Sequence, residues 1–117
     1  MFTGLVIRGE EVARNLGYPT ANLDIHPKAT KLRDGVYAAY ATVRGHAYKC
    51  ALVIQTPIHK VEVYLFDYAG SDFYGVAIDV DPIQKVSEIE PLADAALKAK
   101  IESDIHMIRE ALEKDEL

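Results

Sequence analysis

Four consecutive runs of β-forming residues between positions 35 and 81 constrain the fold of this chain more than any other feature. These runs are dominated by alternating, β-branched and aromatic residues. The runs read GVYAAYATVR, HAYKCALVI, KVEVYLFDY and FYGVAIDVD, with RG at 44–45 and AGSD at 69–72 forming two of the turns. An earlier run, FTGLVIR, adds another strand. Five or more antiparallel strands with no helix between them predict a small, closed or nearly closed all-β barrel, since closure removes exposed strand edges.

The chain changes character after residue 90. Apolar residues recur there at spacings of four, four, three and four, which places them on one face of an amphipathic helix. They are Leu97, Ile101, Ile105, Ile108 and Leu112. Pro91 suits the first helical turn, and Asp94 suits the positive end of the helix dipole. We therefore expect one domain over 1–117, with a barrel over about 2–90 and a C-terminal helix over about 91–114.

Length and charge exclude several classes of protein. A chain of 117 residues fits one globular domain. Its 18 acidic and 13 basic residues give a net charge of −5, which argues against binding to nucleic acid or to an anionic membrane. The single cysteine, Cys50, suits a reducing compartment, and no apolar run approaches the roughly 20 residues of a membrane span. We expect a cytoplasmic protein that acts as a monomer.

The segment GLVIRGEE at 4–11 matches the first half of a phosphate-binding P-loop. Glu10 and Glu11 stand where that motif requires a lysine and a hydroxyl residue, so it is not a Walker motif. Its glycines either form a turn at a strand end or bring backbone N–H groups close to a phosphate. The four histidines lack the spacing of a zinc site.

Glu62 is the most informative ionisable residue. The alternation in KVEVYLFDY places Val61, Val63 and Leu65 on one strand face, and Glu62, Tyr64 and Phe66 on the other. A carboxylate between two aromatic side chains would be partly desolvated, which raises its pKa and suits a general base that accepts a hydroxyl proton. The alternative is a solvent-facing strand glutamate beside Lys60.

Thr20 and Asn22 form a second candidate site, in the stretch LGYPTANLD. Pro19 fixes its own φ, so the preceding residues should hold a turn and present Thr20 and Asn22 at alternate positions on one side. Hydroxyl and amide oxygens suit Mg²⁺, which also takes oxygen ligands from substrate phosphates. The alternative is that these side chains close an Asx or Ser/Thr turn.

Taken in order, these segments resemble the riboflavin kinase (flavokinase) family over roughly residues 2–109. The resemblance is carried by GLVIRG, ARNLGYPTANL, DGVYAAY, VEVYLFDYAGSDFYG and IESDI. Its most specific part is PTAN after LGY, followed about forty residues later by Glu62 and then by the DFYG turn.

The resemblance implies a six-stranded antiparallel Greek-key barrel with a C-terminal helix. It also implies transfer of the γ-phosphoryl group of ATP to the 5′-hydroxyl of riboflavin, which yields FMN and ADP. In the residue-by-residue match, Thr20 and Asn22 fall on the Mg²⁺ and phosphate ligands and Glu62 falls on the catalytic base. The remaining matched positions lie near the nucleotide, and they are Gly9, Arg14, Asp72, Phe73 and Tyr74. Phosphoryl transfer requires mainly positioning and charge neutralisation, so this sparse set can suffice.

The chain departs from the family pattern at four places. Val12 and Ala13 replace an arginine and a glycine of the nucleotide loop, and VIQTPIHK at 53–60 is a shortened version of a longer family segment. Tyr64 replaces a histidine, and Ser87 replaces an arginine. These departures keep two alternatives open, namely a non-catalytic barrel that binds flavin or nucleotide and a flavin kinase with another nucleotide donor.

Overall fold

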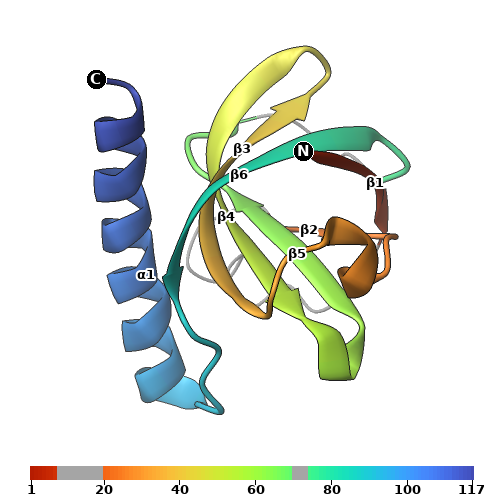
Figure 1. The fold of residues 1–117 in the computed structure, drawn as a ribbon. Helices are drawn as coiled ribbons and strands as arrows, with labels where there is room; N and C mark the ends of the chain where they lie inside the picture. The colour runs from red at the N-terminus through yellow and green to blue at the C-terminus, as the bar shows by residue number, and fades with distance from the viewer. Residues whose placement is uncertain (8–19, 70–73) are drawn as a thin grey trace.

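The computed structural model describes residues 1–7, 20–69 and 74–117. These residues form six strands, two short 3₁₀ helices and one long α-helix (Figure 1). The strands are β1 (Phe2–Ile7), β2 (Thr20–Leu23), β3 (Gly35–Val43), β4 (His46–Gln55), β5 (Lys60–Leu65) and β6 (Ala77–Ser87). The helices are η2 (Pro27–Thr30), η3 (Thr56–Ile58) and α1 (Asp94–Asp115).

The six strands close into an antiparallel barrel in the order β1-β2-β5-β4-β3-β6. Strands β3, β4 and β5 follow one another as neighbours, and β6 returns to pair with β3, which is the Greek-key arrangement. Arg44 and Gly45 join β3 to β4 with positive φ angles of 49° and 84°, as a tight hairpin turn requires. The predicted all-β Greek-key barrel is confirmed.

The period of two along each strand separates the inside of the barrel from its outer face. Alternate residues of all six strands fill the interior, among them Leu52, Val63, Ile78 and Val80. The predicted inward set of β5, Val61, Val63 and Leu65, lies in this interior cluster.

Helix α1 covers part of the outer face, over β3, β4 and β6 (Figure 1). Its apolar stripe packs on outward-facing strand residues that form a second buried cluster, and Arg109 lies 4.5 Å above the ring of Phe66. Of the five residues predicted for the stripe, Leu97 is half-buried and the other four are buried. The helix begins at Asp94 rather than near 91, because Ala93 has an extended backbone and Leu92 N–H donates to the carbonyl of Glu90.

Strand β6 begins and ends later than the alternation predicts. The sequence pattern placed it at 73–81, but Gly75 has a φ of 79° and forms a turn before the strand begins at Ala77. The strand then continues through Pro82 to Ser87. Proline cannot donate to a strand ladder, and β6 accommodates it where the register with β3 shifts between Ala38 and Ala39.

Candidate functional site

The predicted chemical residues meet on the ladder between β2 and β5. Asn22 lies opposite Glu62, and Thr20 lies opposite Tyr64. Opposed residues of an antiparallel pair share a face, so all four side chains belong to the outer face of the barrel. Thr20, Glu62 and Tyr64 are buried and Asn22 is half-buried. Two separate sequence motifs therefore form one polar cluster.

Glu62 is a buried carboxylate with a cation beside it. Only 6% of the residue is exposed, so the alternative of a solvent-facing strand glutamate is wrong. Lys60 lies two residues earlier on the same face of β5, and its Nζ is 3.8 Å from Glu62 Oε2. The side chain of Lys60 is only 17% exposed. The alternation predicted the face of Glu62 correctly, and this side chain lines a cavity together with residues of α1 and of the segment before it.

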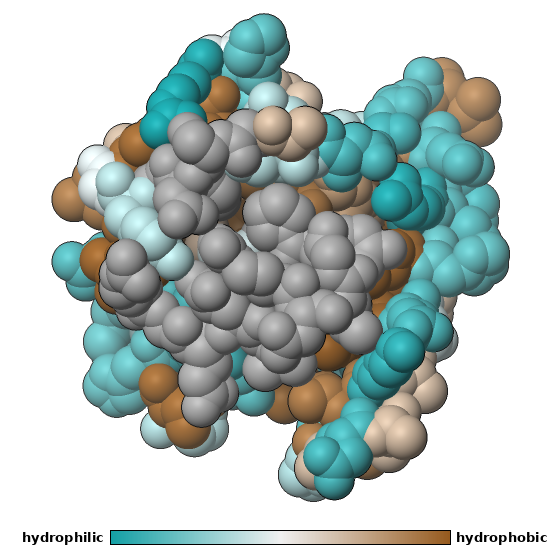
Figure 2. Space-filling view, turned by 180° about the vertical axis from the view of Figure 1, so that it is seen from behind, coloured by the Kyte–Doolittle hydropathy of each residue, from teal (hydrophilic) through white to brown (hydrophobic). Residues whose placement is uncertain are grey.

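A cavity of about 310 Å³ lies between this face and the first half of α1. Its apolar walls come from the barrel, from the segment before the helix and from the helix itself, and include Val36, Val53, Ile89, Leu92 and Leu97. Figure 2 shows apolar surface between the barrel and α1, on the side opposite to that seen in Figure 1. Its polar wall contains Glu62, Lys60, Tyr64, Lys100 and Asp104. Mostly apolar walls with a few convergent polar groups are typical of small-molecule sites of about 300 to 1,000 Å³.

A second hollow of about 420 Å³ opens next to Asn22. It is lined by residues of β1, β2 and the η3–β5 corner, including Ile7, Leu23 and His59. Ile58 and Lys60 border both hollows. The opposed pair Asn22 and Glu62 thus lies at the boundary, with Asn22 facing one hollow and Glu62 facing the other.

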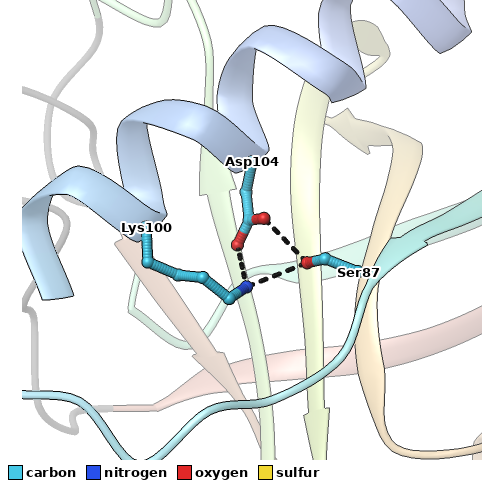
Figure 3. A network of polar contacts seen from close by, with 3 residues as sticks. All are labelled: Ser87, Lys100 and Asp104. Carbon is cyan, nitrogen blue, oxygen red and sulfur yellow. Dashed lines mark hydrogen bonds and ion pairs between the residues drawn. The ribbon is translucent and has the colours of Figure 1, made fainter. Parts of the chain in front are cut away.

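A partly buried polar network joins β6 to α1, and two of its members, Lys100 and Asp104, line the cavity (Figure 3). Ser87 Oγ donates to Asp104 Oδ1 at 2.7 Å, and Lys100 Nζ donates to Ser87 Oγ at 2.9 Å and to Asp104 Oδ2 at 2.6 Å. Asp104 carries a carboxylate, yet it stands among the apolar residues of the helix stripe and is only 2% exposed. Sequence reasoning noted Ser87 but missed this network, although the i, i+4 spacing of Lys100 and Asp104 was a signal for an ion pair.

Of the remaining predicted site residues, the structure describes Tyr74. Gly9, Arg14, Asp72 and Phe73 lie outside the described residues. Tyr74 is half-buried and packs against the interior cluster of the barrel. In the described part of the chain, no group of three or more His, Cys, Asp or Glu side chains is arranged to hold a metal ion. No helix in that part is long and apolar enough to cross a membrane.

Comparison with known proteins decides the family. The family model for riboflavin kinase (Flavokinase) matches residues 1–112. The chain belongs to the riboflavin kinase family. It is 32% identical over 123 aligned residues to the RNA-binding riboflavin kinase RibR of Bacillus subtilis, and this alignment covers 97% of the chain and 51% of RibR. It is 30% identical over 110 residues to the bifunctional riboflavin kinase/FMN adenylyltransferase of Haemophilus influenzae, covering 87% of the chain and 35% of that protein.

Solved structures of other proteins share this fold. The riboflavin kinase from Trypanosoma brucei matches with a TM-score of 0.71 at 24% identity, over 98% of this chain and 78% of that one. A macrolide-efflux protein from Streptococcus pneumoniae matches with a TM-score of 0.72 at 23% identity, over 92% of this chain and 35% of that one. At these identities the likeness concerns the fold alone. In sequence, the chain spans about half the length of RibR and about a third of the bifunctional relative.

Proposed function

We propose that this member of the riboflavin kinase family phosphorylates riboflavin, transferring the γ-phosphoryl group of ATP to the 5′-hydroxyl. The proposal rests chiefly on one observation, which is the pairing of Asn22 with Glu62 at the boundary between two hollows. A kinase requires two binding sites that meet at one reacting point. A buried carboxylate at that meeting point is suited to accept the proton of an attacking hydroxyl.

The apolar walls of the 310 Å³ cavity suit the flavin ring, and the ribityl chain is then directed toward Glu62 on the polar wall. In the reaction, the 5′-oxygen forms a bond to the γ-phosphorus while the bond between that phosphorus and the β–γ bridging oxygen breaks. Glu62 accepts the proton that the 5′-hydroxyl loses, and ADP leaves with the bridging oxygen. Holding the hydroxyl and the phosphoryl group in line supplies much of the rate enhancement in such reactions.

The donor set on β2 fits a hard divalent cation. Thr20 and Asn22 stand two residues apart on one strand, on the same face, and offer a hydroxyl and an amide oxygen. In the proposed enzyme these side chains would hold Mg²⁺, which would neutralise charge on the ATP phosphates. Contacts of the nucleotide with Gly9, Arg14, Asp72, Phe73 and Tyr74 remain predictions from the family resemblance.

The test is FMN formation from riboflavin and Mg-ATP, followed by chromatography, with Glu62→Gln as the diagnostic variant. Glutamine is nearly isosteric but cannot take the proton, so we expect a loss of at least about 100-fold in kcat. Glu113→Gln, an exposed change on α1, is the matched control and should retain full activity.

Full activity of Glu62→Gln would contradict the role of Glu62. No FMN from the unmodified protein, with riboflavin still bound, would instead favour a non-catalytic flavin-binding barrel. Replacement of ATP by other nucleoside triphosphates in the same assay separates a kinase with a different donor from both cases.

A further inference from the structure

Lys60 lies beside the proposed catalytic residue Glu62 but has no role in the reaction described above. It is the first residue of β5, it shares a face with Glu62, and it borders both hollows. Its side chain is 17% exposed, so most of a charged side chain is withdrawn from water. Withdrawal of a cation from water is costly unless an anion accompanies it.

Within the described residues, Glu62 is the one partner of the Lys60 ammonium group, and the contact is loose. The 3.8 Å between Nζ and Oε2 exceeds the roughly 2.7 to 2.9 Å of a charge-assisted hydrogen bond. Lys100 provides a contrast, since its Nζ makes hydrogen bonds of 2.6 and 2.9 Å in its own network. A lysine carries three N–H donors, and those of Lys60 are not engaged in such hydrogen bonds in this part of the chain.

The location also creates an electrostatic need for a cation. A phosphate group attached to the end of a ligand near Glu62 would stand beside a carboxylate. The phosphate and the carboxylate are both anions and repel one another, and this repulsion is strong where water is largely excluded. An ammonium group between the two hollows offsets that repulsion from either side of the transfer.

We propose that Lys60 binds the phosphoryl group at the boundary of the two hollows, and thereby determines the affinity of the flavin cavity for a phosphorylated ligand. This inference rests on the proposed function. Lys60 is a specificity-determining residue here, and the proton transfer remains with Glu62. Lysine suits the task because a compact point charge can follow the phosphoryl group as it moves from donor to acceptor.

Riboflavin and FMN make the test direct, since they differ only by the phosphate. Each flavin is titrated into the protein without nucleotide, and binding is followed by the change in flavin fluorescence. In Lys60→Met we expect riboflavin affinity within about twofold of the unmodified protein, and FMN affinity lower by about tenfold or more, as loss of a hydrogen bond to a charged group predicts. Lys60→Arg keeps the charge and should recover part of the FMN affinity.

Two controls keep the result interpretable. Lys98→Met removes an exposed lysine of α1 outside the cavity and should change neither affinity. If Lys60→Met fails to fold because Glu62 loses its cation, the comparison is made between Glu62→Gln and Glu62→Gln/Lys60→Met. Neutral glutamine removes the buried charge, and the second variant of this pair should again lose FMN affinity selectively.

Unchanged FMN affinity in the lysine variant would overturn the inference, and so would an equal loss of affinity for both flavins. In either case the unmodified protein still binds riboflavin, so the result counts against the role of Lys60 and not against the proposed kinase function, which the FMN assay tests. An unmodified protein that binds neither flavin would contradict the proposed function itself, and the role of Lys60 with it.

Discussion

Lys100→Met is expected to be strongly destabilising, although the substituted residue lies on a helix near the surface. The change removes both hydrogen bonds of the ammonium group and leaves the Asp104 carboxylate, 2% exposed, with Ser87 as its remaining partner in the network. Breaking a buried ion pair by removal of one partner costs about 3 to 5 kcal/mol. Because the Lys100 side chain is 15% exposed and Ser87 still donates, we expect the lower end, about 3 kcal/mol.

Equilibrium unfolding in urea measures this change in the free energy of unfolding, and for a domain of this size it corresponds to a fall in Tm of about 10 °C. Lys98→Met is the matched control, since Lys98 is exposed on the same helix, and should change stability by less than about 0.5 kcal/mol. The double variant Lys100→Met/Asp104→Asn removes the uncompensated charge and should recover part of the loss.

A Lys100→Met protein within about 1 kcal/mol of the unmodified one would refute this reasoning, because it would mean that water reaches Asp104 and replaces the lost partner. A double variant less stable than Lys100→Met would also contradict it, since the penalty would then not arise from an uncompensated carboxylate.

Three further outcomes follow from individual residues. Thr20→Ala should raise the Mg²⁺ concentration needed for half-maximal FMN formation, and an unchanged Mg²⁺ dependence would exclude Thr20 as a ligand. Desolvation, together with a hydrogen bond of 2.9 Å to Glu116, raises the pKa of Tyr40 from 10.0 to about 12. The contribution of the protonated Tyr40 hydroxyl to the free energy of unfolding is therefore complete below pH 10 and is lost as the pH rises through 12. In Tyr40→Phe the free energy of unfolding in urea should fall less steeply with pH over that interval. Burial raises the pKa of the Cys50 thiol well above its ordinary value, so the native protein should not react with a disulfide reagent that modifies it readily in urea.

The barrel was predictable from sequence because its long strands, such as β3 with nine residues and β4 with ten, are rich in β-branched and aromatic residues and are separated by turn signals. Strand β2 was not predicted as a strand. At four residues, Thr20–Leu23 is too short for alternation to stand out after a proline, and its conformation is set by pairing with β1 and β5. The same limit applies to the second half of β6, where Pro82 is normally a sign that a strand has ended.

The candidate site was predictable in its parts and not in its assembly. Alternation placed Glu62 on the correct face, and the spacing of Thr20 and Asn22 placed them on one side of the chain. The burial of Glu62, the cavity under α1 and the proximity of Ser87 to Asp104 arise from contacts between distant segments, which local patterns do not encode. The sequence pattern left open an exposed glutamate beside Lys60, and this interpretation was wrong because Glu62 is buried and Lys60 is half-buried.

Because Asn22 lies opposite Glu62, the polar cluster depends on the register between β2 and β5. A one-residue insertion within β2 or β5 would exchange the two faces of that strand, so Ala21 or Val63 would turn outward and a polar side chain would enter the apolar interior. Such an insertion would abolish both chemistry and folding. The connection between β4 and β5 lies outside the ladder and carries no such constraint. Residues 56–59 can therefore be lengthened or shortened to change ligand preference while the strand pairing is kept.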